Sequence, residues 1–166
     1  MPRMKQILLA AIIVCASVGT ASAGGQPGSI GIGAEFQLSG IGGLSANYDV
    51  GKFHVGGFFG FFDAKGPANT TVDVGGRFFY HLASTAQSDF SLGGSVGIQS
   101  INNPQPGDPN NRDTNVFIEP SFQIRMFIVP NVALSFTGGV EIGAADASEL
   151  NLTGNIIGEG GIHYYF

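Results

Sequence analysis

The amino-acid sequence predicts an all-β fold, namely a transmembrane antiparallel up-and-down β-barrel of eight strands. After the first two dozen residues, the chain divides into alternating segments of roughly ten residues, the length that a tilted strand needs to cross a bilayer. The charged residues of these segments fall opposite the apolar ones. The mean hydropathy of +0.23 is high for a chain whose sequence contains no helical membrane span. A barrel accounts for this combination because its apolar residues are spread one in two along strands.

The first residues have the pattern of a secretory signal peptide. Arg3 and Lys5 precede an uncharged apolar run over residues 7–15, which is too short to span a bilayer as a helix. The motif Ala21-Ser22-Ala23 then offers the small residues that signal peptidase requires. We therefore expect export and cleavage after Ala23.

The expected division of the chain is a signal peptide over 1–23 and a single barrel domain over 24–166. Cys15 would leave with the signal. A lipoprotein acylation site at Cys15 is the alternative, but Val14 directly before it is not the small residue that this signal requires. A mature chain without cysteine excludes disulfides, thiol catalysis and cysteine-based metal sites.

The mature chain is acidic. Without the two bases of the signal it has five bases against twelve acids, for a net charge of −7. Nucleic acid is excluded as a partner because few basic groups remain to neutralise phosphates.

The alternating segments are bounded by turn residues, which sets the expected strands and connections. The strands are expected over 28–38, 43–50, 52–62, 70–82, 89–101, 115–128, 131–144 and 152–166. The outer loops are then 39–42, 63–69, 102–114 and 145–151, and the inner turns fall near residue 51, at 83–88 and at 129–130. Longer connections on one side and shorter ones on the other are typical of membrane barrels.

The outward face of each strand is assigned from its apolar residues only, so the charges test the assignment. Nine strand charges fall on the inner face: Glu35, Asp49, Lys52, Asp73, Arg77, Glu119, Arg125, Glu141 and Glu159. An Arg or Lys facing lipid at the midplane would cost about 2–4 kcal/mol. A soluble sandwich would show the opposite sorting. Pro120 falls on the outer face of its strand, where we expect a bulge or a position near the upper rim.

The last seven residues carry the most specific pattern. Ile162, Tyr164 and Phe166 alternate along the final strand and share its outer face. With the signal motif and the eight segments, this ending resembles the small bacterial outer-membrane barrels of the OmpA/OmpX type over the whole mature chain. The resemblance implies a place in the outer membrane of a Gram-negative cell, contact with outer-membrane lipids, and recognition of these three residues by the barrel assembly machinery.

The inward charges predict a network inside the barrel. Its expected members are Glu35, Asp73, Arg77, Glu119, Arg125, Glu141 and Glu159. Arg77 should be one main counter-charge to the carboxylates and Arg125 the other. The short turn at 129–130 places Glu119 beside Glu141, a pair that would suit acid–base chemistry. We favour a structural network, because ion networks also perturb carboxyl groups.

Histidine chemistry is the second candidate inside the barrel. His54 and His81 fall on adjacent strands and face inward, as does His163. Two histidines without a third positioned ligand do not make a zinc site, which takes three or four protein ligands. We expect no metal and no cofactor.

The function that this pattern favours is a non-enzymatic barrel with a structural or surface-interaction role through its outer loops. The polar, proline-rich loop over 102–114 is the expected contact for an extracellular partner. A narrow channel for small solutes is the alternative. A lipid-modifying enzyme is the third possibility, which needs a Ser–His arrangement at the outer leaflet, whereas all three histidines are expected at the opposite end.

Overall fold

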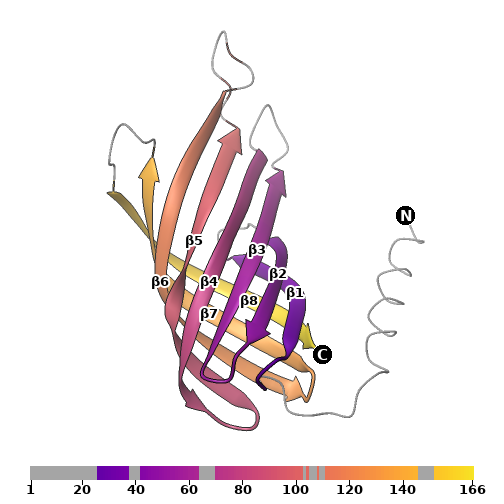
Figure 1. Ribbon diagram of the computed structural model, residues 1–166. Helices are drawn as coiled ribbons and strands as arrows, with labels where there is room; N and C mark the ends of the chain where they lie inside the picture. Colours follow the sequence, from indigo (N-terminus) through magenta and orange to yellow (C-terminus); the bar gives the residue numbers. More distant parts are fainter. Residues whose placement is uncertain are drawn as a thin grey trace, which may run out of the picture.

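The computed structural model describes residues 26–37, 42–63, 70–102, 104, 108, 111–145 and 152–166. Eight strands form one closed antiparallel barrel in which each strand pairs with its neighbours in sequence and β1 pairs with β8 (Figure 1). The expected fold class is therefore confirmed. The expected signal peptide over 1–23 lies outside the described residues. Within the part of the chain that is described, no helix has the length and apolarity to cross a membrane.

The strands match the expected ones to within three residues at every end. They are β1 Ile30–Gln37, β2 Gly42–Asp49, β3 Phe53–Asp63, β4 Thr70–Ser84, β5 Ser88–Asn102, β6 Arg112–Val129, β7 Val132–Ala145 and β8 Leu152–Tyr165. We call the end of the barrel that holds Ile30 and Phe166 the inner end, and the opposite end the outer end. Backbone hydrogen bonds of 3.0 Å in both directions between Ile30 and Phe166 continue the β1–β8 pairing at the inner end.

Alternation along each strand separates an apolar outer surface from the lumen. In β6, Val116, Ile118 and Met126 are half-exposed, while Glu119 and Arg125 between them are buried. The sequence dictates this arrangement because successive side chains of a strand point to opposite faces. The outer surface is an apolar band, and the interior is lined with polar groups.

Lys52 departs from the predicted sorting of charges. It lies with Val50 and Gly51 in the turn between β2 and β3, where its side chain is exposed. Gly51 adopts a φ of +98° there, a conformation that favours glycine and allows the chain to reverse. The prediction that Lys52 points into the lumen is therefore wrong, because the turn begins before it.

Pro120 lies near the middle of β6 without the expected bulge. It pairs with Gly94 of β5 in an unbroken register. On the other side, the pairing with β7 is interrupted at residues 119 and 120. Ile118 lies opposite Ile142 before the gap and Ser121 opposite Gly139 after it, so the register is the same on both sides. Proline has no N–H to donate, which accounts for an interruption without a shift.

The loop predicted over 102–114 is shorter than expected. β5 continues to Asn102 and β6 begins at Arg112, which pairs with Asn102. The side chain of Arg112 donates to Ser100 Oγ at 3.0 Å, and this contact helps the polar end of β6 to extend the hairpin. Nine residues, 103–111, remain between the two strands, and most of them lie outside the described residues.

Val96 offers a test of the lipid-facing surface. It is 54% exposed on β5 and lies opposite Gly76 and Ile118 of the flanking strands. We expect Val96→Arg to lower the free energy of unfolding in lipid vesicles by about 2–4 kcal/mol, because it places a cation in hydrocarbon. Val50→Arg is the matched control, since Val50 is also exposed but lies in a turn. Equal costs for the two variants, measured by urea unfolding, would contradict this assignment of the surface.

Candidate functional site

The barrel interior is the part of the molecule where chemically active groups gather. Among the described residues, buried polar and charged side chains outnumber buried apolar ones. They form two layers along the barrel axis. The inner layer consists of Asp49, His54, His81, Asp89, Arg125 and Tyr165, and the outer layer consists of Glu35, Ser45, Arg77 and His163.

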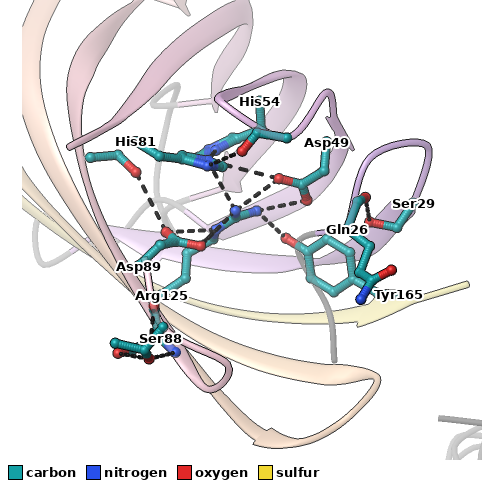
Figure 2. Close-up of polar contacts among 12 residues, drawn as sticks. Gln26, Ser29, Asp49, His54, His81, Ser88, Asp89, Arg125 and Tyr165 are labelled. Carbon is teal, nitrogen blue, oxygen red and sulfur yellow. Dashed lines mark hydrogen bonds and ion pairs between the residues drawn. The ribbon is translucent and has the colours of Figure 1, made fainter. Parts of the chain in front are cut away.

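Arg125 is the centre of the inner layer and has no exposed surface (Figure 2). Its guanidinium donates to both oxygens of Asp49 at 2.8 and 2.9 Å and to both oxygens of Asp89 at 2.7 to 3.1 Å. It also donates to the Tyr165 hydroxyl at 2.9 Å. Such a planar fork suits bidentate carboxylate contacts. One arginine thereby joins β2, β5, β6 and β8 across the inner end of the lumen.

Two histidines complete the inner layer. The Nδ1 atom of His81 lies 2.9 Å from the Gly51 carbonyl, which can only accept, so Nδ1 carries the proton. The Nε2 atom of His81 lies 2.8 Å from Nδ1 of His54 and 3.2 Å from Nη2 of Arg125. In the neutral ring, Nε2 of His81 is then an acceptor for both neighbours.

These histidines and Asp49 also form a set that could hold a metal ion. One ligand atom from each of Asp49, His54 and His81 lies within 4.8 Å of the others. The sequence paired the histidines but missed Asp49 as the third ligand. However, Arg125 lies between Asp49 and His81, at 2.8 Å from a carboxylate oxygen of the first. A metal would have to displace this buried cation, so the set acts as the partner of Arg125.

Arg77 and Glu35 form the centre of the outer layer. Arg77 Nη1 donates to Glu35 Oε1 at 2.6 Å and Nη2 donates to Oε2, so the pair is bidentate. The Arg77 guanidinium also lies 5.1 Å from the centre of the Phe58 ring, within the range of a cation–π contact. Arg77 is thus held between β1 and β3 from its place on β4.

A Ser–His pair is present in the outer layer, which the sequence did not predict. Ser45 Oγ lies 2.6 Å from His163 Nε2, and Glu35 Oε1 lies 3.3 Å from the same nitrogen. A nucleophilic serine needs the acid on the other ring nitrogen, so that the histidine can accept the serine proton. Here His163 Nδ1 has no partner among the described residues, and Ser45 is only 4% exposed. The geometry is that of a structural contact and not of a hydrolase.

Carboxylates are in excess around the outer layer. Glu119, Glu141 and Glu159 join Glu35 and Asp73 in the same half of the lumen, with Arg77 as the nearby cation. Glu119 and Glu141 are electrostatic neighbours, and the two strands resume pairing on either side of them in the predicted register. Neither has a base within a described hydrogen bond, so the pair lacks the partner that proton transfer would require.

The structure brings the seven predicted network residues into the lumen, but in two groups. Arg77 pairs with Glu35, whereas Arg125 binds none of the predicted carboxylates. Its partners are Asp49, which the sequence predicted to face inward, and Asp89, which the sequence did not single out. Asp89 lies directly opposite Arg125 in the pairing of β5 with β6. Nine residues separate these two strands, so the sequence leaves their register open and does not reveal this pair.

Arg125 provides a direct test of the inner layer. We expect Arg125→Ala to lower the free energy of unfolding by about 3–5 kcal/mol, because it leaves Asp49 and Asp89 buried without a counter-charge. Arg112→Ala is the matched control on the same strand, since Arg112 is exposed and should cost about 1 kcal/mol or less. The measurement is urea unfolding followed by circular dichroism. A neutral effect of Arg125→Ala would mean that water screens the lumen charges.

Comparisons with known proteins support the fold. No protein-family model matches the sequence, and no curated protein matches it in sequence. Among solved structures, the N-terminal β-barrel domain of Pseudomonas aeruginosa OprF is similar, with a TM-score of 0.66 and 12% identity over 84% of this chain and 98% of that one. Neisserial surface protein A is similar with a TM-score of 0.51 and 14% identity, over 83% of this chain and 96% of that one. The chain has the fold of the small eight-stranded outer-membrane barrels.

Proposed function

We propose that this protein is a non-enzymatic integral barrel of the bacterial outer membrane, with a structural or surface-interaction role through its outer loops. The observation that carries the proposal is the closure of the lumen by two buried ion-paired layers. Arg125 and Phe79 have no exposed surface, and Arg77 is 6% exposed. With the interior occupied by such contacts, the outer loops are the part of the barrel that is available to partners.

The location rests on the outer surface of the barrel. Apolar side chains cover the faces of the strands, and aromatic residues gather on that surface near the inner end, among them Tyr48, Tyr80 and Phe166. Aromatic belts of this kind occur at membrane interfaces. Together with the expected signal peptide, they favour the outer membrane, with the inner end toward the periplasm.

The surface role rests on the β5–β6 hairpin. β5 and β6 have 15 and 18 residues and extend furthest from the inner end (Figure 1). At the end of β6, Arg112, Asp113 and Thr114 are all exposed. The connection over 103–111 is the longest of the four on this side. One of the similar structures is itself a surface protein of Neisseria.

The narrow channel is the weaker alternative. Eight strands leave an interior wide enough only for side chains. Arg125 alone contacts side chains from β2, β4, β5 and β8, so a solute would have to break several buried hydrogen bonds to pass. Among the described residues, no contact in the lumen favours conduction.

Replacing the connection over 103–111 tests the surface role. We expect a short Gly-Ser link there to reduce binding of cells to surfaces or partners, while expression, heat-modifiable migration on gels and unfolding stability stay unchanged. The barrel should tolerate the change because loop length alters closure entropy only slightly. The same replacement at 64–69 is the matched control. If the variant binds as the parent does and its single-channel conductance rises, the surface role is wrong and the channel takes its place.

The C-terminal residue tests recognition by the barrel assembly machinery. Phe166 is 64% exposed on the same face as Ile162 and stacks near Tyr164, with ring centres 6.0 Å apart. We expect deletion of Phe166 to lower outer-membrane levels in cells and to leave unfolded protein in the periplasm. Refolding of the purified variant into detergent distinguishes a recognition defect from a loss of stability. Unchanged levels in cells would show that this residue is not recognised.

A further inference from the structure

A groove crosses the outer surface of the barrel over β5, β6 and β7. Its volume is about 770 Å³, within the range of about 300–1,000 Å³ that is usual for small-molecule sites. None of its outward-facing lining residues is charged or has a side chain that can form a hydrogen bond. They are Leu92, Pro120, Phe122, Phe136, Gly138 and Val140.

The groove lies where the pairing of β6 with β7 is interrupted. The carbonyl of Pro120 points toward β7, since a Cβ on Gly139 would lie 2.6 Å from its oxygen. In an antiparallel pair a residue directs its N–H and its carbonyl to the same neighbour, so the nitrogen of Pro120 also faces β7. Proline has no N–H, and the pair that Pro120 forms with Val140 therefore lacks one of its two hydrogen bonds.

Glycine and two aromatic rings give the groove its recessed shape. Gly138 has no side chain, and a Cβ there would lie 2.7 Å from the Phe122 ring, so this ring lies over the glycine. The rings of Phe122 and Phe136 border the groove with their centres 6.2 Å apart. Leu92 and Val140 form the sides and are 49% and 44% exposed. The surface is thus hollowed between large apolar side chains.

The groove lies at mid-height of the apolar band. On β6 the outward-facing apolar residues run from Val116 to Ile128, and Phe122 is at the centre of this run. Phe122 pairs with Leu92 of β5 on one side and with Gly138 of β7 on the other. In a barrel that spans the outer membrane, headgroups lie near the two ends of this run and acyl chains surround its centre. A headgroup, a sugar or a polar peptide would not reach the groove.

The shape of the groove distinguishes an acyl chain from a second copy of the barrel. Two barrels meet along convex surfaces, so a neighbouring copy would rest on the sides at Leu92 and Val140 and leave the floor empty. A flexible chain can lie along the floor. Lipid chains are as apolar as the protein surface, so the gain comes from the van der Waals contacts that an empty recess would lose.

We propose that this groove binds one acyl chain of an outer-membrane lipid in a fixed position, in contact with Pro120, Phe122 and Val140. The inference rests on the proposed place in the outer membrane and deepens it. It does not depend on the role of the outer loops.

Native mass spectrometry tests the groove. The barrel is reconstituted in vesicles of palmitoyl-oleoyl phosphatidylethanolamine and palmitoyl-oleoyl phosphatidylglycerol and then extracted into a non-ionic detergent. We expect the parent to retain one phospholipid per barrel. Val140→Trp and Leu92→Trp should each lower this retention about fivefold, because the larger side chain fills the space of the acyl chain. Val74→Trp is the matched control on β4, since Val74 is 51% exposed outside the groove, and it should retain lipid as the parent does.

Heat-modifiable migration on gels confirms that each variant is folded before it is measured, and two variants on different strands keep the test usable if one fails to fold. Equal retention by the parent and both groove variants, or no retention by the parent, would overturn the proposal. A mass of two barrels without lipid would also overturn it and would assign the groove to a second copy. A barrel that is soluble without detergent would contradict the proposed function itself, whereas a detergent-dependent barrel without lipid contradicts only the groove.

Discussion

The rest of this structure depends on one constraint, the need of the backbone N–H and C=O groups along the edges of a sheet to find a partner in the protein. A sheet meets this need only when its two edges join, which β1 and β8 do along their length and through Ile30 and Phe166. Closure of an eight-stranded sheet leaves a narrow interior, and strand alternation sends every second side chain into it. Pro120 shows how far the constraint extends: its strand pairs without a break on one side, and the gap on the other side leaves the register unchanged.

A narrow polar interior has consequences for the charges within it. They lie on the inner faces of the strands within a narrow lumen, and there they bind one another. Arg125 shows the limiting case, with two aspartates and a tyrosine around a guanidinium that has no exposed surface. Such a contact joins distant strands across the barrel. Arg125 also occupies the place that a metal ion would take. Asp49, His54 and His81 therefore lie close together around an arginine.

The fold could be read from the sequence because alternation and turns are local signals. Short turns also fix register: the predicted turn between β6 and β7 placed Glu119 beside Glu141, and the observed pairs Ile118–Ile142 and Ser121–Gly139 on either side of them have this register. The side-chain contacts inside the lumen were harder to predict from the sequence. Asp89 and Arg125 are paired across a hairpin whose nine-residue connection leaves the register open. Ser45 and His163 are separated by 118 positions and meet only because the barrel closes and the side chains cross its interior. No pattern along the chain reports which inward residues meet across the axis. The prediction that Lys52 faces the lumen was wrong for a local reason. The turn between β2 and β3 has three residues, so β3 begins at Phe53 and Lys52 stays in the turn.

The two layers of the lumen differ in charge balance, and this difference bears on what the interior does. At the inner end, Arg125 faces two carboxylates, and all of these groups have partners. In the outer half, Glu35, Glu119 and Glu159 lie near Arg77, and Asp73 and Glu119 each retain a buried oxygen without a partner among the described residues. A conducting path would need groups that release an ion toward both ends. Among the described residues, the acids with an unpartnered buried oxygen lie in the outer half, and the ion-paired layer around Arg125 closes the inner end. This asymmetry disfavours a path for ions through the barrel.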